Sequence, residues 1–382
     1  MSTETRNGSG ADLCALEVRE RIPRLRTALA ESQTDALLVT NLVNVRYLTG
    51  FSGSAGNLLV SGSDALLVTD GRYRTQAAEQ LAAAGIADEV DLHVGKVSAQ
   101  RDAVEAHVRR ARARRVGLEA ENVTWGAKRR IAELLGDVEL VATDGLVERL
   151  RQTKDRGELD RMSKAAAIAD EALGEVLAML CEGRSEEEFA FALDTAMRRL
   201  GAEDRAFDTI IASGPNAAKP HARPGERRIG VGDPVVIDFG ATFEGYRSDM
   251  TRTFCVGTEP TGAMAQAFSV VAEAQAAGVA AVRAHICAGD VDRASRDVVA
   301  AAGLAEAFEH GTGHGVGLDI HEAPAVSEGS TAVLGAGFVV TVEPGVYLPG
   351  VGGVRIEDTV VVGEEGCSPL TCFAKDVVVT AN

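Results

Sequence analysis

Short apolar runs of strand length alternate with longer segments of helical character along the first third of the chain. Three runs rich in leucine and valine are expected to be strands, at residues 36–40, 57–60 and 65–69. The last two flank the turn residues SGSD, which predicts a hairpin. Helices are expected at 16–31, 74–84 and 99–114, with another strand at 116–119. Strands that alternate with helices predict an α/β domain.

Two stretches interrupt this pattern. Residues 44–56 are rich in glycine and serine, and we expect a loop there, either over a cleft or as a plain connection. Residues 147–159 read VERLRQTKDRGEL and are strongly charged. We place the domain boundary near residue 150, so that an N-terminal α/β domain covers residues 15–148 and a second domain covers residues 150–378.

In the second domain, two helices followed by strands occur twice. The first helices are expected at 165–180 and 185–200, the second of them opened by the capping-box sequence SEEE, and strands follow at 234–240 and 246–256. The second pair is expected at 263–283 and 291–302, followed by strands at 338–347 and 354–362. The order of elements predicts an internally duplicated α+β domain, although the two halves share no clear sequence identity.

Composition restricts the class of protein. A chain of 382 residues suggests about two domains, and 46% hydrophobic residues suffice for buried cores. The net charge of −17 argues against a nucleic-acid partner, and no apolar run has membrane-spanning length. Six scattered cysteines are typical of reduced thiols in a cytosolic protein. The first twelve residues lack the features of a signal peptide and are expected to be a frayed tail. We therefore expect a cytoplasmic protein without membrane partners.

A histidine-rich stretch is the first candidate for chemistry. Residues 310–317 read HGTGHGVG, and His310, His314 and His321 fall within twelve residues of one another. Histidine is the commonest metal ligand in proteins. Glycine at four alternate positions disfavours a helix, so we expect an irregular or extended segment that lines a site. The alternative interpretation is a glycine-rich surface loop.

Four acidic residues supply the second candidate. Asp238 ends the apolar run VVID, and Asp249 follows eleven residues later. If the two strands form a hairpin centred between Phe243 and Glu244, the two aspartates lie directly opposite each other, with Cβ atoms about 5 Å apart. The same construction places Glu343 opposite Glu357, across a loop centred on Gly350. Each acid taken singly also fits a solvated strand residue, but that interpretation does not explain why both pairs are opposed.

Such a cluster requires positive charge. Four buried carboxylates and a histidine cannot stay ionised without compensation, and two divalent metal ions would supply it. Oxygen ligands with one imidazole suit several divalent transition metals. We expect Mn²⁺, with Co²⁺, Zn²⁺ or Fe²⁺ as alternatives.

The ordered set Asp238, Asp249, His314, Glu343 and Glu357 resembles the dinuclear metal signature of the methionine aminopeptidase and Xaa-Pro peptidase superfamily. That resemblance implies a pita-bread catalytic domain. The preceding α/β domain, the junction LRQTKDRGEL and the sequence HARPG, seventeen residues before the first aspartate, are similar to the Xaa-Pro aminopeptidase and Xaa-Pro dipeptidase (prolidase) branch, whose N-terminal domain is creatinase-like. The similarity is strong over residues 150–375 and looser over 15–150.

The resemblance also implies ligand roles. Asp238 would bind one metal ion, His314 and Glu343 would bind the other, and Asp249 and Glu357 would bridge both. A water molecule between the two ions would be the nucleophile, because two cations lower its pKa and polarise the scissile carbonyl. Glu343 would be the general base.

Further residues are implied to act on the substrate. His221, His310 and His321 match histidines that bind the peptide, stabilise the tetrahedral oxyanion and transfer protons. Arg355 lies two residues before the second bridging glutamate and would brace that carboxylate or bind a carboxylate of the substrate. Tyr347 is a weaker candidate, with a packing role as the alternative.

The resemblance implies an Xaa-Pro aminopeptidase that acts on small peptides with proline in second position, and it also implies a homodimer. The main alternative is a dipeptidase, which must block the space beyond proline. Three other hypotheses are a metal-free creatinase-like amidinohydrolase, another hydrolase or lyase on the same scaffold, and a non-catalytic peptide-binding protein. The complete set of five ligands disfavours the first and the last of these, but fold alone does not determine function.

Overall fold

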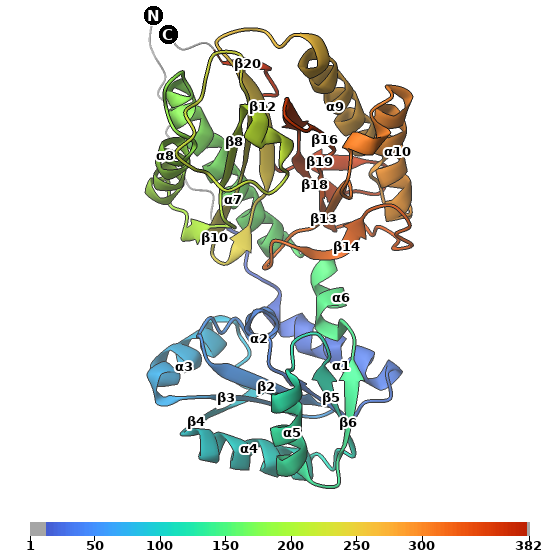
Figure 1. The fold of residues 1–382 in the computed structure, drawn as a ribbon. Coiled ribbons are helices and arrows are strands. Elements are labelled where there is room, and N and C mark those ends of the chain that lie inside the picture. Colours follow the sequence, from blue (N-terminus) through green and yellow to red (C-terminus); the bar gives the residue numbers. More distant parts are fainter. Residues whose placement is uncertain (1–12, 380–382) are drawn as a thin grey trace, which may run out of the picture.

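The computed structural model describes residues 13–379 and shows two domains of helices and strands (Figure 1). The tail expected at residues 1–12 lies outside the described residues. The helices of the N-terminal domain are α1 (Arg21–Glu31), α2 (Leu42–Thr49), α3 (Arg74–Ala83), α4 (Val97–Arg110) and α5 (Trp125–Leu135). Its strands are β1 (Ala36–Val39), β2 (Gly56–Ser61), β3 (Ala65–Thr69), β4 (Val90–Val94), β5 (Arg115–Glu119) and β6 (Glu139–Thr143).

The six strands form one mixed sheet in the order β4-β3-β2-β1-β5-β6, in which β2 and β3 make the predicted hairpin. Side chains alternate between the two faces of a strand. Leu37 and Val39 accordingly pack with α1, α2 and α3, whereas Leu38 packs with α4 and α5 on the other face. Because helices cover both faces, β1 is apolar along its whole length instead of alternating with polar residues.

Part of the loop expected at residues 44–56 is helical, so that expectation is wrong for the first half of the stretch. Helix α2 begins after Asn41, whose side chain accepts a hydrogen bond from the Val43 N–H, and ends at Gly50 in the left-handed region with φ of 74°. Asparagine at the N-cap and a left-handed glycine at the end are strong helix-boundary signals. Val45, Tyr47 and Leu48 are buried and hold the short helix against the sheet.

Helix α6 (Leu146–Gln152) connects the domains and contains the predicted boundary near residue 150. The exact domain limits stay a prediction. The C-terminal domain then presents two helices and a set of strands, twice, as expected. The first set is α7 (Arg156–Val176), α8 (Glu186–Arg199), β7 (Asp204–Arg205), β8 (Ile210–Ser213), β9 (Pro234–Phe239), β10 (Ala241–Phe243), β11 (Tyr246–Arg247) and β12 (Met250–Val256).

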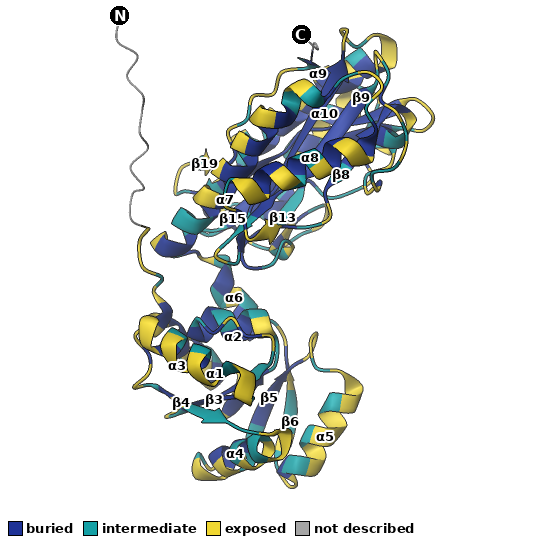
Figure 2. Cartoon of the chain, turned by 90° about the vertical axis from the view of Figure 1, so that its left-hand side faces the viewer, coloured by how far each residue is buried: buried dark blue, intermediate teal, exposed yellow. Residues whose placement is uncertain are grey.

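The second set repeats this order. It consists of α9 (Gly262–Ala281), α10 (Ala288–Ala301), β13 (Gly313–Gly315), β14 (Glu322–Val326), β15 (Val339–Val342), β16 (Gly345–Leu348), β17 (Gly352–Arg355), β18 (Asp358–Val362), β19 (Cys367–Pro369) and β20 (Val378–Val379). Helices α7 and α8 pack on β8, β9 and β12, and α9 and α10 pack on β15–β18. Figure 2 shows these helices with exposed outer faces around largely buried strands.

The two domains share one apolar core. Tyr246, Val316, Leu318 and Val339 of the C-terminal domain belong to the same buried cluster as the inner face of the N-terminal sheet. The segment that follows the histidine-rich strand is therefore packed directly against the N-terminal domain. No helix within residues 13–379 combines the length and the apolar composition needed to cross a membrane.

Candidate metal centre and substrate cleft

A cavity of about 820 Å³ opens in the C-terminal domain and is lined by its strands and loops and by helix α8. Nine of the ten residues selected from the sequence line it, although they come from widely separated segments: His221, Asp238, Asp249, His310, His314, His321, Glu343, Arg355 and Glu357. The tenth, Tyr347, contacts two of them, His310 and Arg355. The histidine-rich stretch is extended at β13 and irregular on either side, as expected for a segment that lines a site. Chain folding thus brings every candidate to one place.

The hairpin that carries the two aspartates has a different register from the predicted one. Asp238 lies opposite Thr251, and the turn is centred on Glu244 and Gly245, with φ of 45° and 81°. The prediction that Asp238 and Asp249 are directly opposed is therefore wrong. A tight turn with two positive φ angles favours glycine at its second central position, which moves the centre of the turn one residue along the chain. The residue opposite Asp238 therefore changes by two positions, from Asp249 to Thr251. A shift of two leaves side chains on the same face of the sheet, so Asp249 becomes a diagonal neighbour of Asp238.

The register predicted for Glu343 and Glu357 agrees with the structure. The β15–β18 and β16–β17 ladders on either side of them share that register, and the two glutamates occupy facing positions between the ladders. Their backbone N–H groups turn to other segments: Glu343 donates to the Thr312 carbonyl over 2.7 Å and Glu357 donates to the Thr251 carbonyl over 3.1 Å. The break in the ladder joins this pair to both the histidine segment and the first hairpin.

The five proposed ligands converge. Oxygen atoms of Asp238, Asp249 and Glu357 all lie within 4.8 Å of one another. Nε2 of His314 lies 3.2 Å from Oε1 of Glu343 and 3.6 Å from Oδ2 of Asp249. One buried oxygen of Asp238 and one of Glu357 have no hydrogen-bond partner within the described part of the chain. Buried oxygens without a partner are unfavourable, and cations would satisfy them, so the residues fit the implied metal ions.

The pKa values of the four acidic residues show the same cost of burying carboxylates close together. Burial raises the pKa of Asp249 and of Glu357 well above their usual range, and repulsion from neighbouring carboxylates adds to the effect. Burial also raises the pKa of Asp238, against the charge of Arg355. Burial acts the same way on Glu343, but the hydrogen bond and charge of His314 outweigh it and hold that pKa at about 2. Bound cations would favour the ionised form of all four carboxyl groups.

His314 presents a ligating nitrogen to this cluster. Its Nδ1 lies 3.0 Å from the Gly315 carbonyl oxygen, which accepts hydrogen bonds but cannot donate them, so Nδ1 carries a hydrogen. The lone pair of a neutral ring is then on Nε2, which faces Glu343 and Asp249. Two acceptors 3.2 Å apart need a proton or a cation between them. A backbone carbonyl that fixes the tautomer in this way is usual for metal-bound histidine.

Two threonines that the sequence interpretation missed hold the acids in place. Thr341 Oγ1 accepts a hydrogen bond from the backbone N–H of His314 and donates one to Glu343, both over 3.0 Å. Thr251 Oγ1 donates to Glu357 over 2.7 Å. Thr341 lies two residues before Glu343 on the same strand face, and that spacing could have identified it. The contact between Thr251 and Glu357 spans 106 residues and has no such local signal.

Arg355 contacts a different acid from the one expected. Its Nη2 donates to Asp238 over 2.5 Å, its Nη1 to Tyr347 Oη over 2.7 Å and its Nε to Thr251 over 3.1 Å. The expectation that it braces Glu357 is wrong, because the chain leaves β17 at Arg355 and the glutamate lies beyond that break. All three guanidinium nitrogens donate to protein acceptors, so the structure offers no support for the alternative pairing with a substrate carboxylate.

Tyr347 connects this arginine to a histidine. His310 Nδ1 donates to the Gly311 carbonyl over 2.7 Å, and burial lowers the pKa of the ring, so the neutral ring accepts at Nε2. Tyr347 Oη, 2.8 Å from that Nε2, is the donor. His221 and His321 are different, because both are exposed residues that line the cavity. They are therefore better placed than His310 to contact a substrate.

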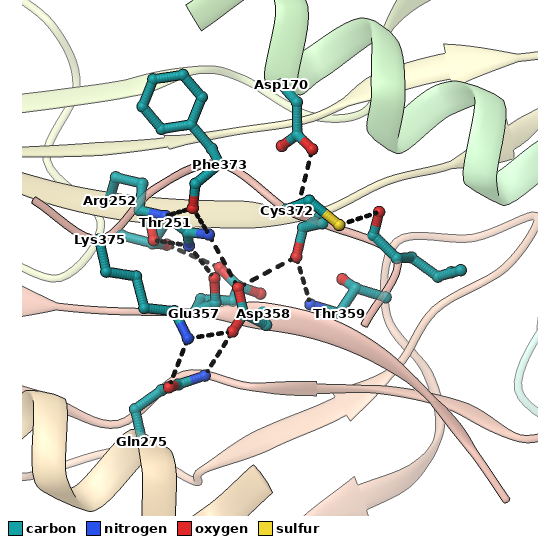
Figure 3. A network of polar contacts seen from close by, with 12 residues as sticks. Asp170, Thr251, Arg252, Gln275, Glu357, Asp358, Thr359, Cys372, Phe373 and Lys375 are labelled. Atoms are coloured by element: carbon teal, nitrogen blue, oxygen red, sulfur yellow. Dashed lines mark hydrogen bonds and ion pairs between the residues drawn. The ribbon is translucent and has the colours of Figure 1, made fainter. Parts of the chain in front are cut away.

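A polar network is built around Asp358, the residue that follows Glu357 in the sequence (Figure 3). Asp358 accepts hydrogen bonds from Arg252, Gln275 and Lys375. Arg252, only 1% exposed, also donates to the backbone carbonyl of Glu357. The network thereby fixes the main chain that carries one of the proposed bridging ligands.

Fold and acidic cluster together define a divalent-metal-dependent hydrolase. The chain belongs to the metallopeptidase family M24, whose model matches residues 160–364. The model of the creatinase/prolidase N-terminal domain matches residues 21–153. The predicted α+β class, with a pita-bread C-terminal domain after a creatinase-like α/β domain, is thus confirmed.

Relatives match over nearly the whole chain. The peptidase YqhT of Bacillus subtilis is 39% identical over 360 residues, which cover 94% of this chain and 99% of the relative. The Xaa-Pro dipeptidase of Pyrococcus horikoshii is 33% identical over 362 residues, with the same two shares. Among solved structures, an Xaa-Pro dipeptidase from Bacillus anthracis has a TM-score of 0.90 at 39% identity and covers 95% of this chain and 100% of its own. An X-Pro aminopeptidase from Thermotoga maritima has a TM-score of 0.84 at 36% identity, covering 94% and 99%.

Proposed function

We propose that this protein is an Xaa-Pro aminopeptidase, which removes the first residue from peptides with proline in second position. The observation that carries the proposal is the convergence of the acid–imidazole cluster and three histidines in one cleft of about 820 Å³. That volume is near the upper end of the range of roughly 300–1,000 Å³ usual for small-molecule sites. The cleft also reaches Phe191, which is 74% exposed, and Phe207, so it has room for residues beyond proline.

Asp238, Asp249, His314, Glu343 and Glu357 would hold two divalent ions, for which we propose Mn²⁺. When bound, such ions polarise the scissile carbonyl and acidify water. The chain's own groups would orient the reaction. Glu343 would accept the proton of the attacking water, in an orientation fixed by the hydroxyl of the threonine two residues earlier.

The histidines divide into two groups in this proposal. His221 and His321 would bind the peptide and donate hydrogen bonds to the developing oxyanion, because both rings line the cleft at exposed positions. His310 donates and accepts within the protein at its two nitrogens, so it would act through Tyr347 and Arg355. A direct contact of His310 with substrate would require the tyrosine hydroxyl to move.

A dipeptidase is the second candidate. Two relatives that match 94% of this chain are named Xaa-Pro dipeptidase. In this chain Arg223, two residues after His221, is exposed and lines the same cleft. A guanidinium at that place suits the C-terminal carboxylate of a dipeptide.

The experiment that separates the candidates compares an Xaa-Pro dipeptide with an Xaa-Pro-Xaa tripeptide. Both are incubated with Mn²⁺-loaded protein and with a chelator-treated control. Hydrolysis of the tripeptide alone establishes an aminopeptidase, and hydrolysis of the dipeptide alone establishes a dipeptidase. If neither is cut although metal is bound, the peptidase proposal is wrong.

We also propose a cytoplasmic homodimer with domains at residues 15–148 and 150–378. The acidic net charge and the free state of all six cysteines support the compartment. The position of α6 between the two domains supports the boundary (Figure 1). The family resemblance supports the dimer. Light scattering during size-exclusion chromatography measures the mass of the assembly directly.

A further inference from the structure

The loop from Gly317 to Glu322 joins the cleft to the domain junction. It ends in two neighbouring residues of opposite environment. His321 is exposed and lines the cleft, whereas the side chain of Glu322, the first residue of β14, is only 6% exposed. His321 forms the bend that leads directly into β14. Because the two residues share a peptide bond, the position of Glu322 constrains the direction in which His321 points.

Two buried cations fix Glu322. Arg151 Nη2 lies 2.5 Å from Oε1 and Lys154 Nζ lies 3.2 Å from Oε2, and the side chains of both cations are at most 4% exposed. The backbone N–H of Asp319 donates to Oε1 as well. Burial by itself would raise the pKa of Glu322, but Lys154 and Arg151 outweigh it and hold that pKa at about 2. The carboxylate is thus ionised, paired and nearly dry, and removal of a partner from such a pair is strongly unfavourable.

The N-terminal domain holds the arginine in turn. Arg151 Nη1 donates to Asn44 Oδ1 over 2.8 Å. The amide of Asn44, on α2, donates to Glu119 over 2.8 Å and to Glu148 over 2.6 Å. A continuous chain of polar contacts therefore runs from the end of β5 in the N-terminal sheet, through α2 and α6, to Glu322.

The other side of the loop contacts the metal centre. The rings of His321 and His314 meet edge to face, with centroids 4.4 Å apart and an interplanar angle of 76°. The loop also closes tightly around the glutamate, because a Cβ at Gly317 would come within 2.7 Å of the carboxylate oxygens of Glu322. A rearrangement of Glu322 thus has little freedom to leave His321 unmoved.

We propose that Glu322, clamped by Arg151 and Lys154, is a positioning residue for His321, so that the N-terminal domain sets the orientation of a histidine in the cleft. The inference rests on the proposed function only for its kinetic readout. The clamp does not touch the substrate. It acts by holding the histidine where the peptide and the adjacent ligand His314 require it.

The kinetic test is a double-mutant cycle in the metal-loaded full chain. Glu322→Gln alone should lower kcat for an Xaa-Pro peptide ten- to hundredfold, the order expected for a misplacement of about 1 Å, with a smaller change in KM. In a His321→Asn background the same substitution should change kcat less than about threefold. An equal loss in both backgrounds, or an unchanged kcat in Glu322→Gln alone, overturns the proposal.

Two further variants keep the test interpretable. If Glu322→Gln fails to fold, Lys154→Gln retains the pair between Arg151 and the glutamate and should show a smaller loss of kcat that also disappears in the His321→Asn background. Arg156→Gln is the matched control, because it breaks an exposed pair of 2.9 Å with Asp160 just after the junction. Its kcat should stay at the wild-type value, and a loss equal to that of Glu322→Gln contradicts a specific clamp.

A spectroscopic test does not depend on peptidase activity. In Zn²⁺-loaded protein with labelled histidine rings, the ring signal of His321 is assigned by its disappearance in His321→Asn. At one fixed pH, Glu322→Gln should shift this signal and leave that of the distant His285 in place. If the signal does not move, the positioning proposal fails. If it moves while the wild-type protein cuts no Xaa-Pro peptide, the proposed function fails and the clamp stands.

Discussion

The hydroxyl of Tyr347 and Nε2 of His310 are joined by a hydrogen bond of 2.8 Å, and the same hydroxyl accepts one from Arg355 over 2.7 Å. Tyr347, which is 5% exposed, is thus more than a packing residue. It links a histidine of the cleft to the arginine that holds Asp238, so His310 and Asp238 are joined by one hydrogen-bonded chain.

Tyr347→Phe removes this link while it preserves the ring. Because a buried guanidinium loses one acceptor, we expect a loss of about 1.5–3 kcal/mol in the free energy of unfolding, measured by urea denaturation. Tyr73→Phe is the control, since the Tyr73 hydroxyl forms its bond to Ser54 at an exposed site and should change stability by about 0.5 kcal/mol or less. Equal effects of the two substitutions would show that the buried link contributes nothing.

Asp249→Asn should have different effects on the stability of the metal-free protein and on its stabilisation by metal. Without metal, the carboxylate is buried among like charges, so the amide should leave the melting temperature of the metal-free protein unchanged or higher. With metal, the wild-type protein should gain about 2.7 kcal/mol at a hundredfold excess over the dissociation constant, and the variant should gain less. Thermal melts with and without Mn²⁺ measure both. A variant that is stabilised by Mn²⁺ as strongly as the wild type excludes Asp249 as a ligand.

Thr341→Val keeps the shape of the side chain and removes its hydroxyl. Because that hydroxyl orients Glu343 and the His314 backbone, metal affinity should fall about ten- to hundredfold, as is typical when a partner of a ligand is lost. Competition with a chelating dye measures the affinity. Thr27→Val, on the exposed side of α1, is the control and should bind as tightly as the wild type. Unchanged affinity of Thr341→Val would contradict an orienting role.

The ion pairs of Glu322 with Arg151 and Lys154 predict a dependence of stability on acid pH. The folded-state pKa of Glu322 is about 2, below its ordinary value of 4.5, so its ionised form contributes stability above pH 4.5. That contribution, on the order of 3 kcal/mol, is lost as pH falls from about 4.5 through 2. The gap in unfolding free energy between the wild type and Glu322→Gln should therefore narrow over this window. A gap that stays constant from pH 6 to pH 3 would show that Glu322 does not titrate with a lowered pKa.

Local sequence patterns predicted much of this structure. The alternation of helices and strands in the N-terminal domain and the two helix pairs of the C-terminal domain followed from apolar periodicity, whereas α2, β4, α5 and β6 were not predicted. The facing positions of Glu343 and Glu357 followed from the symmetry of a hairpin. The register of the first hairpin failed because the conformation of its turn is set by the glycine at position 245. One residue of error at a turn becomes a shift of two in the pairing.

Other features depend on contacts that no local pattern contains. Arg151 and Glu322 are 171 residues apart, and a single arginine in a charged segment fits a solvated surface equally well. The contact of Arg355 with Asp238 spans 117 residues and depends on how the two halves of the domain face each other. The facing positions of Glu343 and Glu357 could be predicted within their own hairpin, whereas the partners of the acids required the tertiary fold.

The central claim is metal-dependent hydrolysis before proline, and one experiment tests it most directly. A tripeptide Xaa-Pro-Xaa and its counterpart with alanine in place of proline are incubated with protein of known Mn²⁺ content, and the released N-terminal amino acid is quantified by mass spectrometry. The account predicts release from the proline peptide that disappears with chelator and returns with Mn²⁺, and little release from the alanine peptide. Equal release from both peptides, or no release from protein that contains two metal ions per chain, would contradict it.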